Sequence, residues 1–259
     1  MHQPPRKPRF PLPLDRVAAR AVPRATPPTA ATMPAAPGTT GLGLDSQAVR
    51  ARMVERIRAE GIHCPPVLEA LARVPRHGFV DAGLAAQAYE DTSLPIGHGQ
   101  TISKPSVVAR MLALLFERRP GAQRLGRVLE IGTGCGYQAA LLSCLATQVI
   151  SVERLRPLHD KARDNLAPLR QMNLRLVYGD GKLGHAPNAP YDAIVSAAGG
   201  ENLPQAWLDQ LVVGGRLVAP LHSGEGAAQV LVTVDRDENG WSRRVHEGVR
   251  FVPLRSGTA

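Results

Sequence analysis

The segment 127–138, near the middle of the chain, most constrains what this sequence can fold into. An apolar run containing one acid is followed by glycine at every second position, and then by residues that favour a helix. A short apolar run with glycine directly after it is typical of a buried strand. Gly132, Gly134 and Gly136 allow a sharp turn and a close approach to a ligand, because they carry no Cβ. The N–H groups that open the next helix would face that ligand, so the segment predicts a nucleotide-cofactor loop.

The glycine spacing separates two kinds of cofactor. Dinucleotide-binding loops space their glycines as G-x-G-x-x-G, whereas this chain has G-x-G-x-G with Glu130 two positions before the first glycine. The glycine spacing therefore does not favour a nicotinamide dehydrogenase. That class of enzyme stays an alternative, which a thermal-shift comparison of cofactors would settle.

Strands alternate with helices from residue 127 onward. We expect strands over residues 127–131, 148–153, 174–178, 191–197, 216–221, 229–235 and 249–254. We expect helices over about residues 137–146, 155–170 and 204–211. This alternation predicts an α/β fold with a doubly wound, mainly parallel sheet of seven strands. Such a sheet binds ligands at the carboxyl ends of its strands, where Glu153 and Asp180 fall beside the glycine loop.

Residues 45–259 are expected to form a single domain with two parts. The first, residues 45–120, is a helical preface with helices over 46–60, after Pro65, and over 106–116. It also contains a loop at 94–105, rich in glycine, proline and hydroxyl residues, of the kind that often carries function. The second part, residues 121–259, holds the Rossmann-like core and the C-terminal strands.

Residues 1–44 form a Pro-, Ala- and Arg-rich extension that we expect to be disordered. They contain 10 of the 23 prolines, and six basic residues against one acid give them +5 of the net charge of +9. Such a composition cannot bury enough apolar surface to offset the entropy of ordering. Met33 is a possible alternative start. A module that binds nucleic acid through this basic segment is a further alternative, and steep salt dependence would be its signature.

The two acids at the strand ends suit an adenosyl cofactor. A carboxylate at Glu153 can accept hydrogen bonds from both ribose hydroxyls, although NAD offers the same diol. Asp180 lies between two glycines and is placed to meet the adenine, although Asp and Gly also favour an ordinary turn. Together with the glycine loop, these two acids predict an adenosyl cofactor.

Other features exclude some classes of protein. Cys64, Cys135 and Cys144 form no C-x-x-C pair, and their odd number gives no disulfide framework, so we expect reduced thiols in a cytoplasmic protein. No run approaches the roughly 18 apolar residues of a membrane span. The histidines, including His98 and His159, show no metal-ligand spacing, so no metal is expected.

The glycine loop resembles motif I of the class I S-adenosyl-L-methionine-dependent methyltransferases. Three blocks, at residues 94–105, 127–138 and 249–254, resemble the protein-L-isoaspartate O-methyltransferase family, and its bacterial branch most of all. The resemblance extends over roughly residues 46–254. It implies transfer of a methyl group from S-adenosyl-L-methionine to the free α-carboxylate of isoaspartyl residues in damaged proteins and peptides. The methyl ester would then cyclise to a succinimide, which begins the repair.

The resemblance also implies the residues of the site. Ser103 is the candidate catalytic residue and would face the substrate carboxylate, while Phe251, Val252 and Pro253 would line a groove for the extended peptide. The residues implied in cofactor binding are Gln100, Thr101, Ile102, Ser103, Glu130, Gly132, Thr133, Gly134, Cys135, Glu153, Asp180 and Gly181. His98 and Lys104 depart from the family pattern near the substrate, so peptide preference could differ.

The implied chemistry requires positioning rather than proton transfer. An α-carboxyl group has a pKa of about 3.3–3.7, so the substrate is already a nucleophile at neutral pH. We expect a monomer whose partners are isoaspartyl proteins and peptides. A class I methyltransferase that acts on a small molecule or an RNA would share the glycine loop, Glu153 and Asp180, and is the main alternative.

Overall fold

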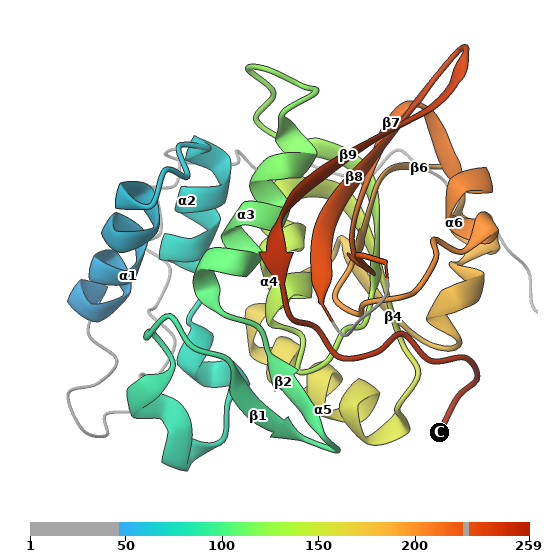
Figure 1. The fold of residues 1–259 in the computed structure, drawn as a ribbon. Coiled ribbons are helices and arrows are strands. Elements are labelled where there is room, and N and C mark those ends of the chain that lie inside the picture. Colours follow the sequence, from blue (N-terminus) through green and yellow to red (C-terminus); the bar gives the residue numbers. More distant parts are fainter. Residues whose placement is uncertain (1–46, 225–227) are drawn as a thin grey trace, which may run out of the picture. The chain divides into compact units, whose positions relative to one another are not determined.

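A sheet of seven strands forms the centre of the structure, a computed structural model that describes residues 47–224 and 228–259 (Figure 1). The strands lie in the order β5-β4-β3-β6-β7-β8-β9. The first five in this order are parallel, while β8 is antiparallel to both of its neighbours. Their bounds are β3 Leu125–Ile131, β4 Ala146–Glu153, β5 Leu174–Tyr178, β6 Tyr191–Ser196, β7 Leu211–His222, β8 Gln229–Asp237 and β9 Gly240–Val249. This topology confirms the predicted doubly wound, mainly parallel sheet.

Helices cover both faces of this sheet, because alternate strand residues point to opposite sides. Val128 and Val149 face an apolar cluster that includes buried residues of α3, α4 and α5. Leu129 and Ile150 face the other side, where they belong to a second cluster with Trp207 of α6. The helices are α3 Pro105–Phe116, α4 Tyr137–Leu145, α5 Arg156–Leu166 and α6 Gln205–Asp209. The strand order reverses between β3 and β6, so this point is where such a sheet binds its ligand.

The helical preface packs on the outside of this layer. Helices α1 (Gln47–Ala59) and α2 (Pro65–Arg73) lie against α3 and α4 (Figure 1). Gly61 follows α1 with a φ of +94°, a conformation that ends helices and that glycine adopts without strain. Two short 3-10 turns, η1 (Arg76–Phe79) and η2 (Ala82–Gln87), lead from α2 toward the loop at 94–105.

That loop contains a β-hairpin that the sequence pattern did not reveal. Strands β1 (Leu94–Gly97) and β2 (Gln100–Ile102) pair antiparallel around a tip formed by His98 and Gly99. Both tip residues have positive φ, +53° and +67° respectively, as a two-residue type I′ turn requires. The expected signal, Asn-Gly or Asp-Gly between alternating residues, is missing, because histidine occupies the first tip position.

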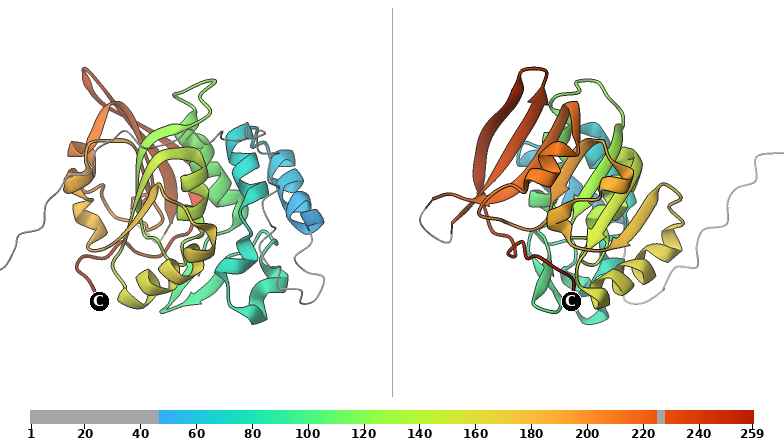
Figure 2. Two further views of the ribbon diagram at one scale, coloured as in Figure 1. Left: turned by 180° about the vertical axis from the view of Figure 1, so that it is seen from behind. Right: turned by 90° about the vertical axis from the view of Figure 1, so that its right-hand side faces the viewer.

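The prediction of a final strand over residues 249–254 is wrong. The last strand is β9, which pairs with β8 as a hairpin that extends past the ends of the other strands (Figure 2). Most residues of β9 are exposed, so this edge strand lacks the apolar run that the prediction relied on. The apolar residues 251–254 instead cross the end of the sheet as an irregular segment that bridges to Gly199 at Pro253.

The other predicted helices and strands of the core are present, with ends shifted by a few residues. Additional 3-10 turns are η3 (Ala167–Leu169), η4 (Gly181–Leu183) and η5 (Ala186–Asn188). The extension 1–44 and Ser46, the predicted start of the first helix, lie outside the described residues. Within the described part of the chain, no helix combines the length and apolar character needed to cross a membrane.

Candidate active site

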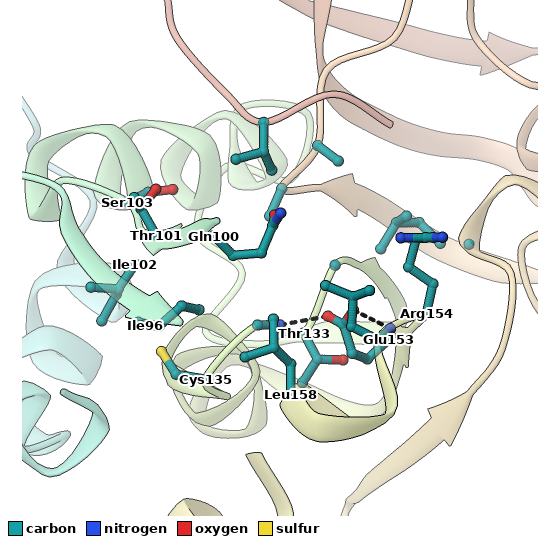
Figure 3. A pocket seen from close by; sticks show the side chains of 18 of the residues that line it. Ile96, Gln100, Thr101, Ile102, Ser103, Thr133, Cys135, Glu153, Arg154 and Leu158 are labelled. Carbon is teal, nitrogen blue, oxygen red and sulfur yellow. Dashed lines mark hydrogen bonds between the residues drawn. The ribbon is translucent and has the colours of Figure 1, made fainter. Parts of the chain in front are cut away.

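A cavity of about 360 Å³ opens at the carboxyl ends of β3 and β4. Figure 3 shows residues of β2 along one side and Glu153 with Arg154 on the opposite side. Twelve of the predicted site residues line it: Gln100, Thr101, Ile102, Ser103, Gly132, Thr133, Gly134, Cys135, Glu153, Gly181, Val252 and Pro253. Three predicted residues, Glu130, Asp180 and Phe251, are not part of the lining. The cavity therefore brings together segments that are far apart in the sequence.

The glycine loop forms the floor of this cavity. It leaves β3 through Gly132, whose N–H donates to the Val152 carbonyl oxygen at 2.9 Å, and so stays beside β4. Gly136 has a φ of +93°, and a Cβ there would lie 3.0 Å from a methyl group of Leu166. Both the backbone conformation and the packing therefore require glycine immediately before α4.

Glu153 is held rigidly where β4 ends. Its side chain is buried, and its two carboxylate oxygens accept the N–H groups of Gly134 and Leu155, each at 2.9 Å (Figure 3). Each oxygen retains acceptor capacity, because a carboxylate offers about four lone-pair sites. A fixed pair of acceptor oxygens at the edge of the cavity can accept hydrogen bonds from two hydroxyl groups of a ligand.

Glu130 lies behind the glycine loop and is fully buried. The Ser151 hydroxyl donates to its Oε2, and Ser151 Oγ lies 2.6 Å from the Thr133 hydroxyl, which lines the cavity. The other carboxyl oxygen of Glu130, Oε1, has no hydrogen-bond partner among the described residues. Burial raises the pKa of Glu130 to about 8. Glu130 therefore supports the loop through Ser151 and Thr133, and it is largely protonated at neutral pH.

Replacing Glu130 by glutamine is expected to flatten the dependence of stability on pH. The native state keeps the proton to about pH 8, whereas the unfolded carboxyl loses it near the ordinary value of 4.5. The unfolded state binds fewer protons in this window, so the wild-type free energy of unfolding falls as pH rises, by at most about 1.4 kcal/mol per unit. Denaturant unfolding at pH 5, 6.5 and 8 should show this slope reduced in Glu130→Gln. The exposed Glu238→Gln is the control, and equal slopes in all three proteins would contradict the assignment.

The candidate catalytic residue, Ser103, lies on the side of the cavity opposite Glu153. Ser103 directly follows β2 and is half-buried, and its Oγ has no hydrogen-bond partner among the described residues. The Ser103 carbonyl oxygen accepts a hydrogen bond from Arg76 at 2.7 Å. The Ser103 hydroxyl is thus available to a ligand, while its backbone is anchored.

The C-terminal segment forms a third side of the cavity. The amide of Gln229 holds Phe251, accepting its N–H at 2.7 Å and donating to its carbonyl oxygen at 3.2 Å. Gly199 pairs with the next residues, donating to Val252 O at 2.8 Å and accepting from Leu254 N–H at 2.7 Å. Val252 and Pro253 face the cavity, while Phe251 packs against the apolar core.

Asp180 makes only backbone contacts among the described residues. One carboxylate oxygen accepts the Lys182 N–H at 2.9 Å, and the other accepts the Gly257 N–H at 2.6 Å. Arg154 donates to the Gly257 carbonyl oxygen, and Ala259 pairs with Arg154 and Arg156, so the C-terminus lies beside the start of α5 (Figure 2). The neighbouring Gly181, rather than Asp180, lines the cavity.

Sequence reasoning missed several residues of the site. Arg154 and Leu158 line the cavity next to Glu153, and their position just after a parallel strand could have indicated them. Arg255 also lines it, although nothing local marks this residue. His98, noted only as a departure from the family pattern, lies at the tip of the β1–β2 hairpin and lines the cavity.

The cysteines and acids of the described region suggest no other chemistry. Cys64, Cys135 and Cys144 are free, and burial raises the pKa of the Cys135 thiol to about 11, so it stays protonated. No group of three or more His, Cys, Asp or Glu side chains in residues 47–224 and 228–259 could hold a metal ion.

Sequence comparisons identify close relatives. The sequence profile of a family described as protein-L-isoaspartate(D-aspartate) O-methyltransferase (PCMT) matches residues 48–259. A protein of Leptothrix cholodnii named protein-L-isoaspartate O-methyltransferase is 60% identical over 276 residues, covering 99% of this chain and 97% of its own. A Methylibium petroleiphilum protein of the same name is 60% identical over 261 residues and covers 97% of each chain.

Solved structures give a matching result. A protein-L-isoaspartate O-methyltransferase superposes with a TM-score of 0.72 at 27% identity, covering 80% of this chain and 66% of that one. A Plasmodium falciparum structure, titled as a protein of the same kind in complex with S-adenosyl-L-homocysteine, superposes with a TM-score of 0.68. It is 24% identical and covers 80% of this chain and 98% of that one, so it supports the fold alone.

Proposed function

Since this chain belongs to the protein-L-isoaspartate(D-aspartate) O-methyltransferase family, we propose that its cavity seats a methyl donor beside the peptide carboxylate. The enzyme uses S-adenosyl-L-methionine and methylates the free α-carboxylate of isoaspartyl residues in proteins and peptides. One observation carries the assignment of the site: Gln100–Ile102 with Ser103, the glycine loop with Glu153, and Val252 with Pro253 all line one cavity. Relatives that are 60% identical do not favour a small molecule or an RNA as substrate.

The residues present fit the cofactor. When bound, S-adenosyl-L-methionine supplies an electrophilic methyl group on a sulfonium centre. We propose that Glu153 binds the ribose hydroxyls, that the backbone around Gly132 and Gly134 contacts the cofactor, and that Gln100, Thr101, Ile102 and Cys135 close the other side. Gly181 would border the adenine, with Asp180 fixing that turn. Glu130 would act from behind, through Ser151 and Thr133.

Ser103 would orient the substrate. Its hydroxyl has no protein partner among the described residues, so it can donate to an oxygen of the α-carboxylate. No general base is needed, since that carboxylate is ionised at neutral pH. Holding the reacting oxygen in line with the methyl group can supply roughly 7–11 kcal/mol. A site that excludes water favours the reaction further, because opposite charges cancel in it.

The peptide groove would follow the C-terminal segment. Both backbone groups of Phe251 are occupied by Gln229, so the contacts to a peptide would come from Val252 and Pro253, which face the cavity. Phe251 would support this edge from the apolar core. His98, on the hairpin tip, would contact residues that flank the isoaspartate and influence peptide preference.

We further propose that the chain acts as a cytoplasmic monomer. All proposed site residues come from one chain, and three free thiols suit a reducing compartment. Residues 45–259 would constitute the catalytic domain, with 1–44 as an appendage dispensable for methyl transfer. Deleting residues 1–44 is the direct way to examine that division.

Repair itself tests the proposed function. An isoaspartyl peptide incubated with enzyme and S-adenosyl-L-methionine should gain a methyl ester and then, through a succinimide, accumulate the aspartyl isomer. Chromatography that separates the isomers follows both steps, and the reaction without S-adenosyl-L-methionine is the control. Methylation of RNA but not of the peptide would favour the alternative substrate class.

A further inference from the structure

Arg76 is a fully buried arginine outside the cavity, and the proposed contacts to cofactor and peptide do not involve its side chain. Its Nη2 donates to the Ser103 carbonyl oxygen at 2.7 Å, and its Nε donates to the Ala88 carbonyl oxygen at 2.8 Å. Its guanidinium carbon lies 4.8 Å from the centre of the Tyr137 ring. No carboxylate forms a salt bridge with Arg76 within residues 47–224 and 228–259.

A buried cation without a salt-bridge partner is costly, because it loses its hydration, and the charge of Asp91 attracts it without forming an ion pair. Burial accordingly lowers the pKa of Arg76 from its ordinary value. What the side chain gains is a connection between three segments: the end of η2 at Ala88, the residue after β2 at Ser103, and the first residue of α4 at Tyr137. Tyr137 directly follows the glycine loop and itself lines the cavity.

We propose that Arg76 is a positioning residue, which fixes the peptide group of Ser103 relative to the glycine loop and so aims the Ser103 hydroxyl at the substrate carboxylate. The inference rests on the proposed role of Ser103. Arg76 does not line the cavity, so it acts through Ser103 and Tyr137 rather than by touching the reactants. A guanidinium suits this task, because its planar fork donates to two carbonyl oxygens at once.

Arg56 offers a matched control. Its Nη2 donates to the Tyr89 carbonyl oxygen at 2.6 Å, so it anchors the residue next to Ala88. Within the described chain, Arg56 makes no hydrogen bond with Ser103 or Tyr137. Arg56 is exposed, unlike Arg76, so Arg56→Met removes an arginine anchor of the same segment while leaving the connection to the site intact.

The test compares Arg76→Met, Arg76→Lys and Arg56→Met in the full-length enzyme. Arg76→Met is expected to lower kcat with an isoaspartyl peptide by about 10- to 100-fold, since small misplacements of reacting groups cost that much. Arg76→Lys, which keeps the charge but not the fork, should fall in between, and Arg56→Met should stay within about two-fold. Calorimetric affinity for S-adenosyl-L-homocysteine should change by less than about three-fold. Hydrogen exchange of amides 101–103 should become faster in Arg76→Met, to a smaller extent in Arg76→Lys, and not in Arg56→Met.

Several results would overturn the inference. One is a folded Arg76→Met with wild-type kcat, and another is a loss of S-adenosyl-L-homocysteine affinity as large as the loss of kcat. A third is an Arg76→Met effect that is undiminished in a Ser103→Ala background, since residues that act through one another are not additive. If Arg76→Met does not fold, Arg76→Lys provides the test. Wild-type kcat and exchange rates in Arg76→Lys would reject the inference. A several-fold lower kcat together with faster exchange in Arg76→Lys would support it.

The same experiments separate the inference from the proposed function. Unchanged turnover in Ser103→Ala alone would reject the proposed role of Ser103. A loss in Ser103→Ala without a loss in Arg76→Met would reject only the role of Arg76.

Discussion

Glu153→Gln is expected to weaken the binding of S-adenosyl-L-homocysteine by about 100-fold, as measured by calorimetry. The carboxylate holds two backbone N–H groups, from Gly134 and Leu155, and would accept both ribose hydroxyls as well. Hydrogen bonds to a charged acceptor contribute about 1.5–3 kcal/mol each, and glutamine offers a donor in place of one acceptor oxygen. One backbone N–H would then face an amide N–H, which also disturbs the glycine loop.

The exposed Glu238→Gln in the β8–β9 turn removes the same charge away from the site and should bind as the wild type does. Thermal unfolding of Glu153→Gln should remain cooperative, which separates loss of the ligand contact from loss of the fold. An affinity within about three-fold of wild type in a folded Glu153→Gln would mean that the ribose lies elsewhere.

Ser103→Ala is expected to lower kcat/KM for an isoaspartyl peptide by about 10- to 100-fold. Losing one hydrogen bond to a charged group corresponds to about 1.5–3 kcal/mol, and this loss should act on the transition state as well as on substrate binding. Affinity for S-adenosyl-L-homocysteine, whose ribose contacts lie on the opposite wall, should change far less. Initial rates over a range of peptide concentrations give both constants.

Ser93→Ala is the control for this change, because Ser93 is an exposed serine just before β1 and does not line the cavity. Full turnover with an unchanged KM in Ser103→Ala would eliminate the proposed role. Equal losses in Ser93→Ala and Ser103→Ala would instead point to a general disturbance of the β1–β2 hairpin.

The sequence predicted those parts of the site that depend on neighbouring residues in the chain, namely the glycine loop and Glu153. The glycines at 132, 134 and 136 adopt positive φ because they lack a Cβ, and Glu153 ends a strand that the apolar residues Val149, Ile150 and Val152 indicate. The carboxyl ends of parallel strands lie at the same edge of a sheet. The parallel arrangement alone therefore predicted that the glycine loop and Glu153 lie close together.

Long-range pairing explains what the sequence could not reveal. Strand β9 is an exposed edge strand that exists through its hydrogen bonds to β8, so its own residues carry no apolar signal. Arg76 joins Ala88, Ser103 and Tyr137, which follow it by 12, 27 and 61 positions in the chain, and a lone arginine after a proline gives no hint of burial. Gln229 likewise holds Phe251 from 22 positions away.

The central claim is that the cavity selects a free backbone carboxylate presented by a β-linked aspartate. The most direct measurement compares methyl incorporation from labelled S-adenosyl-L-methionine into two peptides that differ only in that linkage. We expect incorporation into the isoaspartyl peptide at a rate at least about 100-fold above that of the aspartyl isomer. Equal labelling of both peptides, or of neither, would contradict it.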